Sequence, residues 1–198
     1  AAGLTGSMAP DNYGDVNNFD LLDKPVPAGT SQPTAPWPSV TTGYFAAMGI
    51  PRLEGRLFTD ADSTDAPPVV VVSRSWADLY YPRQSALGKR MNAGGCTTCP
   101  PTTVVGVVGD VRYRGLAGQA DAVYSPIAQG GGTSIYLVVR SRLGAASTLR
   151  ALRSIVASLD PNIAPVEVVM TDRLREALGD PRRWTAVVGA FAAAGALL

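Results

Sequence analysis

VVVVSRSWADLYYP, residues 69–82, is the stretch that decides the fold. Four β-branched residues bounded by prolines and a serine predict a buried strand. Ser73 or Ser75 can cap the helix that follows, which carries Trp76 and ends at Pro82. A strand that leads directly into a helix indicates a packed domain that contains both kinds of secondary structure.

The stretch just upstream predicts a second, shorter helix. Residues 41–50 read TTGYFAAMGI, in which Tyr44, Phe45 and Met48 share one face of a helix. Pro51 closes this helix, because proline cannot continue a helical hydrogen-bond pattern.

Residues 1–40 contain many prolines, which disfavour a helix and favour an extended path. This segment is either a linker or a strand with a long excursion that returns to the core. We favour the second interpretation, because Phe19, Leu21 and Leu22 need burial.

The downstream sequence alternates between strand and helix patterns. Residues 134–141 are apolar almost throughout, so we expect this strand at the centre of the sheet. The order of elements contains no strict βαβ repeat, so the expected fold class is α+β. The predicted strands are 88–92 and 102–111, which form a hairpin, then 122–128, 134–141 and 165–170, and the predicted helices are 145–161 and 171–180.

The composition argues against most kinds of catalysis. The chain has 198 residues, a formal net charge of +1 and no histidine. The small net charge gives a nucleic acid no reason to bind. The missing histidine removes the commonest general acid–base and the commonest metal ligand. We therefore expect no catalytic residue, no cofactor-binding residue and no metal ligand, and an extracytoplasmic hydrolase is the weakest hypothesis.

Cys96 and Cys99 have the CxxC spacing. A redox dithiol places its first cysteine at a helix N-terminus, but Pro100 and Pro101 prevent a helix from starting here. A zinc site needs about four ligands, which two thiols do not supply. We expect a disulfide between Cys96 and Cys99 that closes a hairpin loop, with free thiols, redox activity or metal binding as the alternatives.

Two charged clusters are candidates for sites. Asp60, Asp62 and Asp65 lie in one acidic loop, but the glycine and distal glutamate of a calcium loop are missing. We interpret this loop as a solvated surface turn. The charged residues of 110–114 follow a strand, where such residues are usually solvated or paired.

The last residues, 182–198, read RRWTAVVGAFAAAGALL. The uncharged part is shorter than the roughly 20 residues of a transmembrane helix, so a buried core helix is one interpretation. We favour the start of a transmembrane helix, because the stretch has no polar face and because Arg182, Arg183 and Trp184 are typical of a membrane boundary. The chain would then be part of a longer protein.

A series of short motifs, in a fixed order, gives a specific resemblance. They are GYF at 43–45, MGIP at 48–51, GR at 55–56, Phe58, the valine strand, Trp76 to Pro82, LGK at 87–89, VVGVVGDVRYRGL, AVYSPIAQ, YLVVRS and LDPNIAPVEVVMTDRLREAL. In this order and spacing they resemble the MacB-like periplasmic core domain of FtsX-type ABC transporter permeases, especially the duplicated-orphan kind. The resemblance covers residues 40–198, and residues 1–39 match only loosely.

The resemblance implies an architecture. A porter-like α/β subdomain would comprise residues 1–50 and 133–181, and an inserted, mostly β subdomain would comprise residues 51–132. Residues 182–198 would begin a transmembrane helix.

The resemblance also implies a function. The chain would be the non-catalytic, extracytoplasmic domain of a permease that transmits ATP-driven motion mechanically, for substrate efflux or for regulation of a partner. Its location would be the bacterial inner membrane, with this domain facing the periplasm. The implied partners are an ABC ATPase subunit, the membrane, a periplasmic protein and a second copy of the parent protein. We expect residues 179–181, between the last helix and the apolar stretch, to pass the motion.

One other function remains open at this point. A membrane-anchored, extracytoplasmic module that binds a ligand or a protein, without any role in transport, would share the same apolar tail. The neighbouring sequence separates the two hypotheses, because a permease has several membrane spans and a simple anchor has one.

Overall fold

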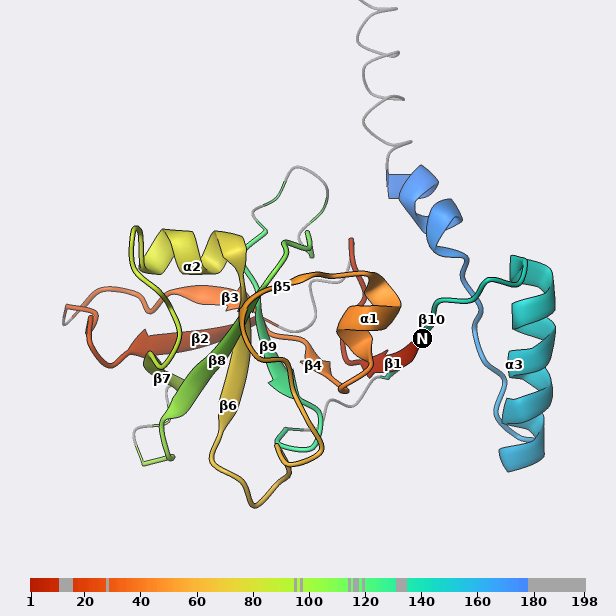
Figure 1. Cartoon of the computed structure of the whole chain (residues 1–198), viewed down its shortest axis with the longest axis horizontal. Coiled ribbons are helices and arrows are strands. Elements are labelled where there is room, and N and C mark those ends of the chain that lie inside the picture. The colour runs from red at the N-terminus through yellow and green to blue at the C-terminus, as the bar shows by residue number, and fades with distance from the viewer. Residues whose placement is uncertain are drawn as a thin grey trace, which may run out of the picture. The chain divides into compact units, whose positions relative to one another are not determined.

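The computed structural model describes residues 1–10, 16–27, 29–94, 96, 98–113, 115, 118, 120–130 and 135–177 (Figure 1). The chain divides into two compact units, unit 1 from Ala1 to Arg140 and unit 2 from Ser141 to Leu198.

Unit 1 is built around one sheet, which has ten strands among the described residues. The strand order is β10-β1-β4-β9-β6-β8-β7-β2-β3, and β5 pairs with β8 beside this path. The strands are β1 (Ala2–Thr5), β2 (Val16–Leu21), β3 (Thr34–Pro36), β4 (Ser39–Val40), β5 (Arg52–Gly55), β6 (Val69–Ser73), β7 (Arg90–Ala93), β8 (Thr102–Val108), β9 (Val123–Pro126) and β10 (Tyr136–Val139); the helices are α1 (Tyr44–Met48) and α2 (Arg74–Tyr80).

The valine strand β6 lies inside the sheet, and all five of its residues are buried. It pairs in parallel with β8 and antiparallel with β9. Its alternate valines belong to two hydrophobic clusters, one containing Trp76 and the other containing Phe45. A strand covered on both faces needs an uninterrupted apolar run. Each buried valine stabilises the fold by about 1.5–3 kcal/mol relative to an exposed one.

Helix α2 begins where β6 ends. The Ser73 hydroxyl accepts the Trp76 N–H at 3.2 Å and the Ala122 N–H at 2.9 Å. Ser73 is therefore the cap of the predicted helix, while Ser75 is bonded elsewhere. This cap ties the start of α2 to the residue that precedes β9.

The proline-rich segment returns to the core, as expected. Strand β2 pairs antiparallel with both β3 and β7. Phe19 is fully buried, and its ring centroid lies 5.7 Å from that of Trp76. The prediction of burial is confirmed for Phe19 and Leu21 but wrong for Leu22, which is 41% exposed because β2 ends at Leu21 and the chain turns.

Two predicted strands differ from the structure. Strand β10 lies at the edge of the sheet rather than at its centre and, among the described residues, pairs only with β1. Leu137 is accordingly 50% exposed. An apolar run of this length does not reveal whether a strand has one neighbour or two. Residues 165–170 form no strand, because no strand of the described chain offers them hydrogen-bond partners.

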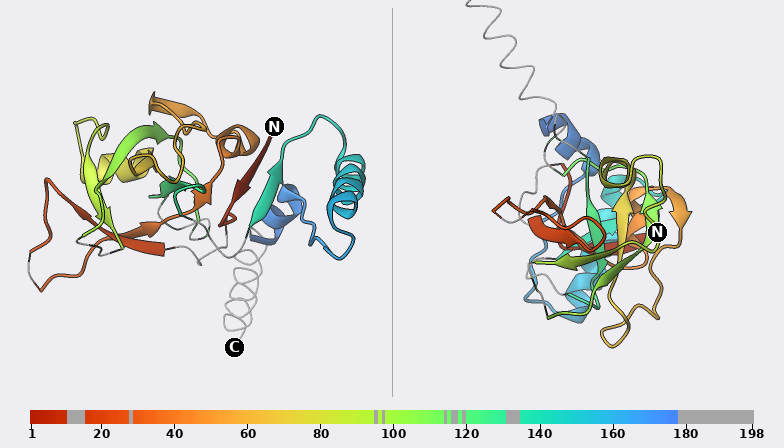
Figure 2. Two further views of the ribbon diagram at one scale, coloured as in Figure 1. Left: turned by 90° about the horizontal axis from the view of Figure 1, so that it is seen from below. Right: turned by 90° about the vertical axis from the view of Figure 1, so that its left-hand side faces the viewer.

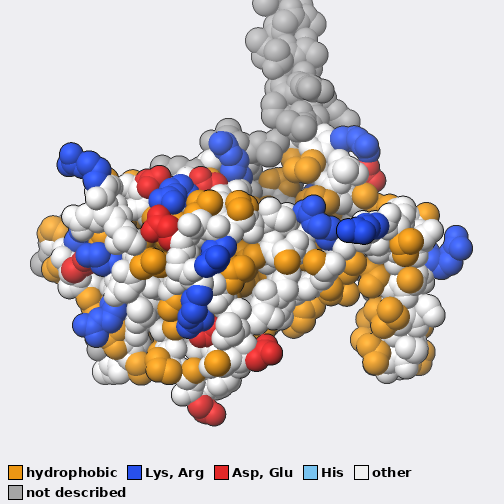
Figure 3. Space-filling view, viewed as in Figure 1, with side chains coloured by type: hydrophobic (Ala, Val, Ile, Leu, Met, Phe, Trp, Pro, Cys, Tyr) orange, Lys and Arg blue, Asp and Glu red, His pale blue; other side chains and the backbone are white. Residues whose placement is uncertain are grey.

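The described part of unit 2 contains α3 (Ala145–Leu159) and a last helical stretch at residues 170–177. The predicted helix at 145–161 is confirmed, although none of its residues is fully buried. On the face shown in Figure 3, hydrophobic side chains gather over α3. Arg153 of α3 forms an ion pair with Glu167, which lies between α3 and the last helical stretch. This pair holds the connecting segment against α3.

Among the residues that the structure describes, no helix has the length and apolar character needed to cross a membrane. The expected transmembrane stretch at 182–198, including Arg182, Arg183 and Trp184, lies outside the described residues, as does the expected junction at 179–181. The expected α+β fold class is confirmed by the large mixed sheet and the few helices.

Candidate functional site

The charged residues after β8 are used to support a helix. Asp110 accepts the Ser75 N–H at 2.8 Å and the Ser75 hydroxyl at 2.6 Å. Asp110 is therefore paired, which is one of the two states expected for charged residues at this position. Both residues line a cavity of about 310 Å³ together with Leu79, Arg112 and Asp121. Arg114 lies outside the described residues.

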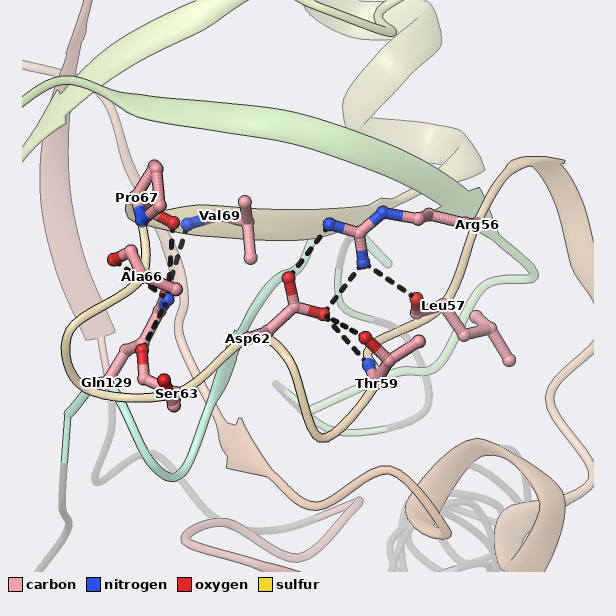
Figure 4. Close-up of polar contacts among 9 residues, drawn as sticks. All are labelled: Arg56, Leu57, Thr59, Asp62, Ser63, Ala66, Pro67, Val69 and Gln129. Carbon is pink, nitrogen blue, oxygen red and sulfur yellow. Dashed lines mark hydrogen bonds and ion pairs between the residues drawn. The ribbon is translucent and has the colours of Figure 1, made fainter.

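The acidic loop is more than a solvated turn, because Asp62 is buried at 6% exposure. Arg56 donates two hydrogen bonds, of 2.7 and 2.8 Å, to the Asp62 carboxylate (Figure 4). The same carboxylate accepts the Thr59 N–H at 2.8 Å. The interpretation as a solvated turn is therefore wrong for Asp62, whereas Asp60 and Asp65 are exposed.

The pKa shifts of Arg56 and Asp62 are those of a stable ion pair. The hydrogen bonds from Arg56 hold the pKa of Asp62 below its ordinary value, although burial opposes this shift. The same pairing raises the pKa of Arg56. Both groups are thus held in their charged forms, which is the opposite of what a proton-transfer site needs.

A second side chain holds the other half of this loop. The Gln129 amide nitrogen donates to the carbonyls of Ser63 and Pro67, at 3.1 and 3.2 Å, and its oxygen accepts the Val69 N–H at 3.1 Å (Figure 4). The Thr64 hydroxyl donates to the Ala128 carbonyl at 2.6 Å. These contacts fix the loop that leads into β6 to the segment that follows β9.

The cysteines lie in the loop between β7 and β8, the predicted hairpin. In the structure a disulfide joins Cys96 and Cys99, and the Cys99 N–H points at the Cys96 sulfur at 3.1 Å. Cys99 is exposed. Across the described part of the chain, no cluster of three or more Cys, Asp or Glu side chains is arranged to hold a metal ion.

A buried group of tyrosines links α1 to the sheet. The hydroxyls of Tyr44 and Tyr113 lie 2.6 Å apart, and the ring of Tyr124 contacts both tyrosines. Burial raises the pKa of Tyr44 to about 12 and also raises those of Tyr113 and Tyr124. All three hydroxyls are therefore protonated near neutral pH.

The two ends of unit 1 meet in one ladder. Strand β1 pairs antiparallel with β10, and the two lie side by side in Figure 2. On its other edge, β1 donates its Leu4 N–H to the Thr41 hydroxyl at 2.8 Å. We take this junction, together with α1, as the candidate functional site, because here the chain both enters and leaves the sheet.

Two glycines allow α1 to lie against β1. A Cβ on Gly43 would lie 2.0 Å from the Ala2 carbonyl oxygen, and a Cβ on Gly3 would lie 2.4 Å from the Tyr44 nitrogen. The backbones can approach this closely only without side chains at these positions. Sequence reasoning did not assign this role, although the GYF motif at 43–45 contains one of the two glycines.

Comparison with known proteins identifies the kind of domain. A family model described as "MacB-like periplasmic core domain" matches residues 8–173. The macrolide export ATP-binding/permease protein MacB of Aggregatibacter actinomycetemcomitans is 26% identical over 136 residues, which cover 69% of this chain and 19% of that protein. The chain thus spans about a fifth of the length of this curated relative.

One solved structure shares the fold. The crystal structure of the periplasmic region of MacB from Actinobacillus actinomycetemcomitans has a TM-score of 0.54 at 20% identity, covering 80% of this chain and 66% of that one. The extracellular domain of the noncanonic ABC-type transporter YknZ from Gram-positive bacteria has a TM-score of 0.44 at 20% identity, covering 70% of this chain and 69% of that one.

Proposed function

The chain belongs to the MacB-like periplasmic core domain family, and from that membership we propose that it is the extracytoplasmic domain of an ABC transporter permease. Its role is mechanical: it receives ATP-driven motion from the membrane segment and passes it to the periplasmic side, for efflux or for regulation of a partner. We call the longer protein that contains it the parent protein. The observation that carries this proposal is the family match over residues 8–173.

The contacts of unit 1 suit a body that transmits force. Its interior is packed on both faces of β6, and the loop before β6 is fastened by Arg56 and Gln129. Closely packed interiors transmit strain instead of absorbing it. The disulfide at Cys96 and Cys99 closes a further loop. The function needs no catalytic group in this domain.

The proposal includes a location and partners. The domain faces the periplasm from the bacterial inner membrane, and residues 182–198 begin a membrane-spanning helix bounded by Arg182, Arg183 and Trp184. ATP is hydrolysed by a separate ABC ATPase subunit or domain. A periplasmic protein and a second copy of the parent protein are the further partners that we propose.

We also propose that the domain has two subdomains. Residues 1–50 and 133–181 form the porter-like part, and residues 51–132 form the inserted β-rich part. The pairing of β1 with β10 supports the first assignment, because it brings together segments from both ends of unit 1. The segment at 179–181 is the proposed mechanical link to the membrane helix.

A linker insertion tests this function. A dye is attached at Leu79→Cys, an exposed position on α2, and the two native cysteines are already joined to each other. The parent protein is reconstituted with its ATPase, and the coupling ratio is measured as the ATP-dependent dye response per ATP hydrolysed. A flexible Gly/Ser insertion after Gly179 is expected to abolish the response while hydrolysis continues.

The matched control is the same insertion after Gly29, in an exposed turn of unit 1. This variant is expected to keep the wild-type coupling ratio. Full coupling in the Gly179 variant would refute the mechanical role. A parent protein that binds no ATPase would instead favour an anchored binding module.

A further inference from the structure

Arg140 occupies the last position of unit 1, the point at which the chain leaves the sheet. Its N–H donates to the Ala1 carbonyl at 2.8 Å, and the Ala1 nitrogen donates to the Arg140 carbonyl at 3.0 Å. These two bonds extend the β1–β10 ladder by one pair beyond Ala2 and Val139. The main chain of Arg140 therefore holds the two ends of unit 1 together.

The side chain of Arg140 reaches a third element. Its Nε donates to the Ala47 carbonyl and its Nη2 donates to the Met48 carbonyl, both at 2.8 Å. The last carbonyls of a helix have no partner within the helix, and a cation at this end is favourable. The guanidinium thus caps α1, although it comes from more than ninety residues further along the chain.

Gly49 makes room for this contact. It is the C-cap of α1 and has a left-handed φ of 72°. A Cβ at this position would lie 2.6 Å from Arg140 Nη2. Glycine suits the left-handed backbone, and a side chain at this position would displace the guanidinium from the two carbonyls.

Helix α1 is itself fixed to the core. Tyr44 and Phe45 are fully buried, and the backbone at Gly43 lies directly against β1. Arg140 consequently connects the end of an edge strand to a helix that cannot move without disturbing the packed interior. Without the guanidinium, β10 would be held by its ladder with β1, which can open one hydrogen bond at a time, and by the packing of Val138 against the cluster that contains Phe45.

We propose that Arg140 is a positioning residue that locks the two ends of unit 1 to α1, so that displacement of the segment after residue 140 moves unit 1 as one body. This role rests on the proposed function, since it matters only if the segment after residue 140 carries motion. Arg140 touches neither substrate nor nucleotide in this account. It acts by fixing where the chain leaves the sheet.

Substitutions in the reconstituted parent protein test this role. Arg140→Gln is expected to lower the coupling ratio about fivefold, because two charge-assisted hydrogen bonds are lost. Arg140→Lys is expected to give an intermediate value, because an ammonium group can meet only one of the carbonyls at a time. Arg142→Gln, at an exposed arginine two residues further on, is the control and should match the wild type.

Hydrogen exchange in the same proteins checks the contact itself. The Ile50 N–H bonds to the Phe45 carbonyl at the end of α1, and it is expected to exchange about five- to tenfold faster in Arg140→Gln.

A cross-link between β1 and β10 tests whether the lost coupling of Arg140→Gln can be restored. Leu4 and Leu137 face each other as a non-hydrogen-bonded pair, a geometry that accepts a disulfide. Leu4→Cys with Leu137→Cys is expected to restore coupling in Arg140→Gln.

The outcomes separate this role from the proposed function. A wild-type protein without any ATP-dependent dye response would overturn the proposed function, and the role of Arg140 with it. A wild-type response that Arg140→Gln retains, while its Ile50 amide exchanges faster, would overturn the role of Arg140 alone. Loss of coupling that the cross-link restores would support the lock.

Discussion

Replacing Asp62 by asparagine tests whether the acidic loop is structural. The buried carboxylate accepts two bonds from Arg56 and two from Thr59, at distances between 2.7 and 3.3 Å. Asparagine has nearly the same shape, but its amide group would face the Arg56 donors with hydrogens of its own.

The loss in the free energy of unfolding expected for Asp62→Asn follows from these contacts. A hydrogen bond to a charged group contributes about 1.5–3 kcal/mol. The Arg56 side chain is 47% exposed, so solvent weakens its share of the interaction. One asparagine oxygen can still accept the Thr59 N–H. The expected loss in the free energy of unfolding is therefore about 2 kcal/mol at neutral pH.

The pH dependence gives a second, independent signature. The pKa of Asp62 is lowered in the folded state. Its contribution to stability is therefore present above the unfolded pKa of about 3.9 and is lost as the pH falls through the lower folded value. The difference between wild type and Asp62→Asn should be largest at neutral pH and should shrink in acid.

Urea unfolding followed by tryptophan fluorescence at pH 7 and at pH 3 measures both effects. Asp60→Asn is the control, because Asp60 is exposed in the same loop, and its effect should stay within about 0.5 kcal/mol. An Asp62→Asn protein as stable as the control, or a difference that does not change with pH, would refute the reasoning.

Three further variants probe the packing of α1 and the disulfide loop. Tyr44→Phe removes the hydroxyl that contacts Tyr113 and should cost about 1–3 kcal/mol in a urea titration. Since the folded pKa of Tyr44 is about 12, wild-type stability should fall as the pH rises above about 10, and this loss should be smaller in the variant. Cys96→Ser with Cys99→Ser should lower stability by at most about 2 kcal/mol, measured by thermal unfolding, because the closed loop is very short. Gly43→Ala should displace β1 and cost about 1–3 kcal/mol, seen as faster hydrogen exchange of the β1 amides.

For each of these three variants, one result would contradict the prediction. An unchanged alkaline transition in Tyr44→Phe would contradict its buried state. A loss well above 2 kcal/mol in the serine double variant would mean that the disulfide holds more than its own loop. Gly130→Ala is the control for Gly43→Ala, because a Cβ at Gly130 meets no atom within 4 Å, and equal effects of the two substitutions would contradict the close approach.

Local patterns in the sequence predicted the local structure well. The valine run gave β6, and the serine that follows gave the cap of α2. Both depend on neighbours along the chain, so their physical causes are visible in a short stretch of sequence. The disulfide expected between Cys96 and Cys99 also rested on local features, the spacing of the cysteines and the flanking prolines.

The contacts of the candidate site and of the loop before β6 could not be predicted in this way. Gln129 reaches the loop before β6 from more than sixty residues away, and Arg140 reaches α1 from more than ninety. Which arginine meets which carbonyl depends on the order of strands in the sheet. Even Asp62 was missed, although Arg56 is close in sequence, because an aspartate in an acidic loop usually faces solvent.

The edge position of β10 could not be predicted from the local sequence either. The run at 134–141 has an equally apolar pattern whether one strand or two lie beside it. Its position builds the candidate site, because an edge strand that pairs with β1 brings the two ends of unit 1 together. The sequence pattern therefore identified the strand but not the junction that it forms.

The most direct measurement places a dye at Leu79→Cys and a quencher on the lipids of the outer leaflet, in vesicles that contain the parent protein and its ATPase. Energy transfer is compared between the nucleotide-free state and a state trapped with ATP. Trapping is expected to change the transfer efficiency, because motion reaches unit 1. Equal efficiencies in the two states, with hydrolysis intact, would contradict it.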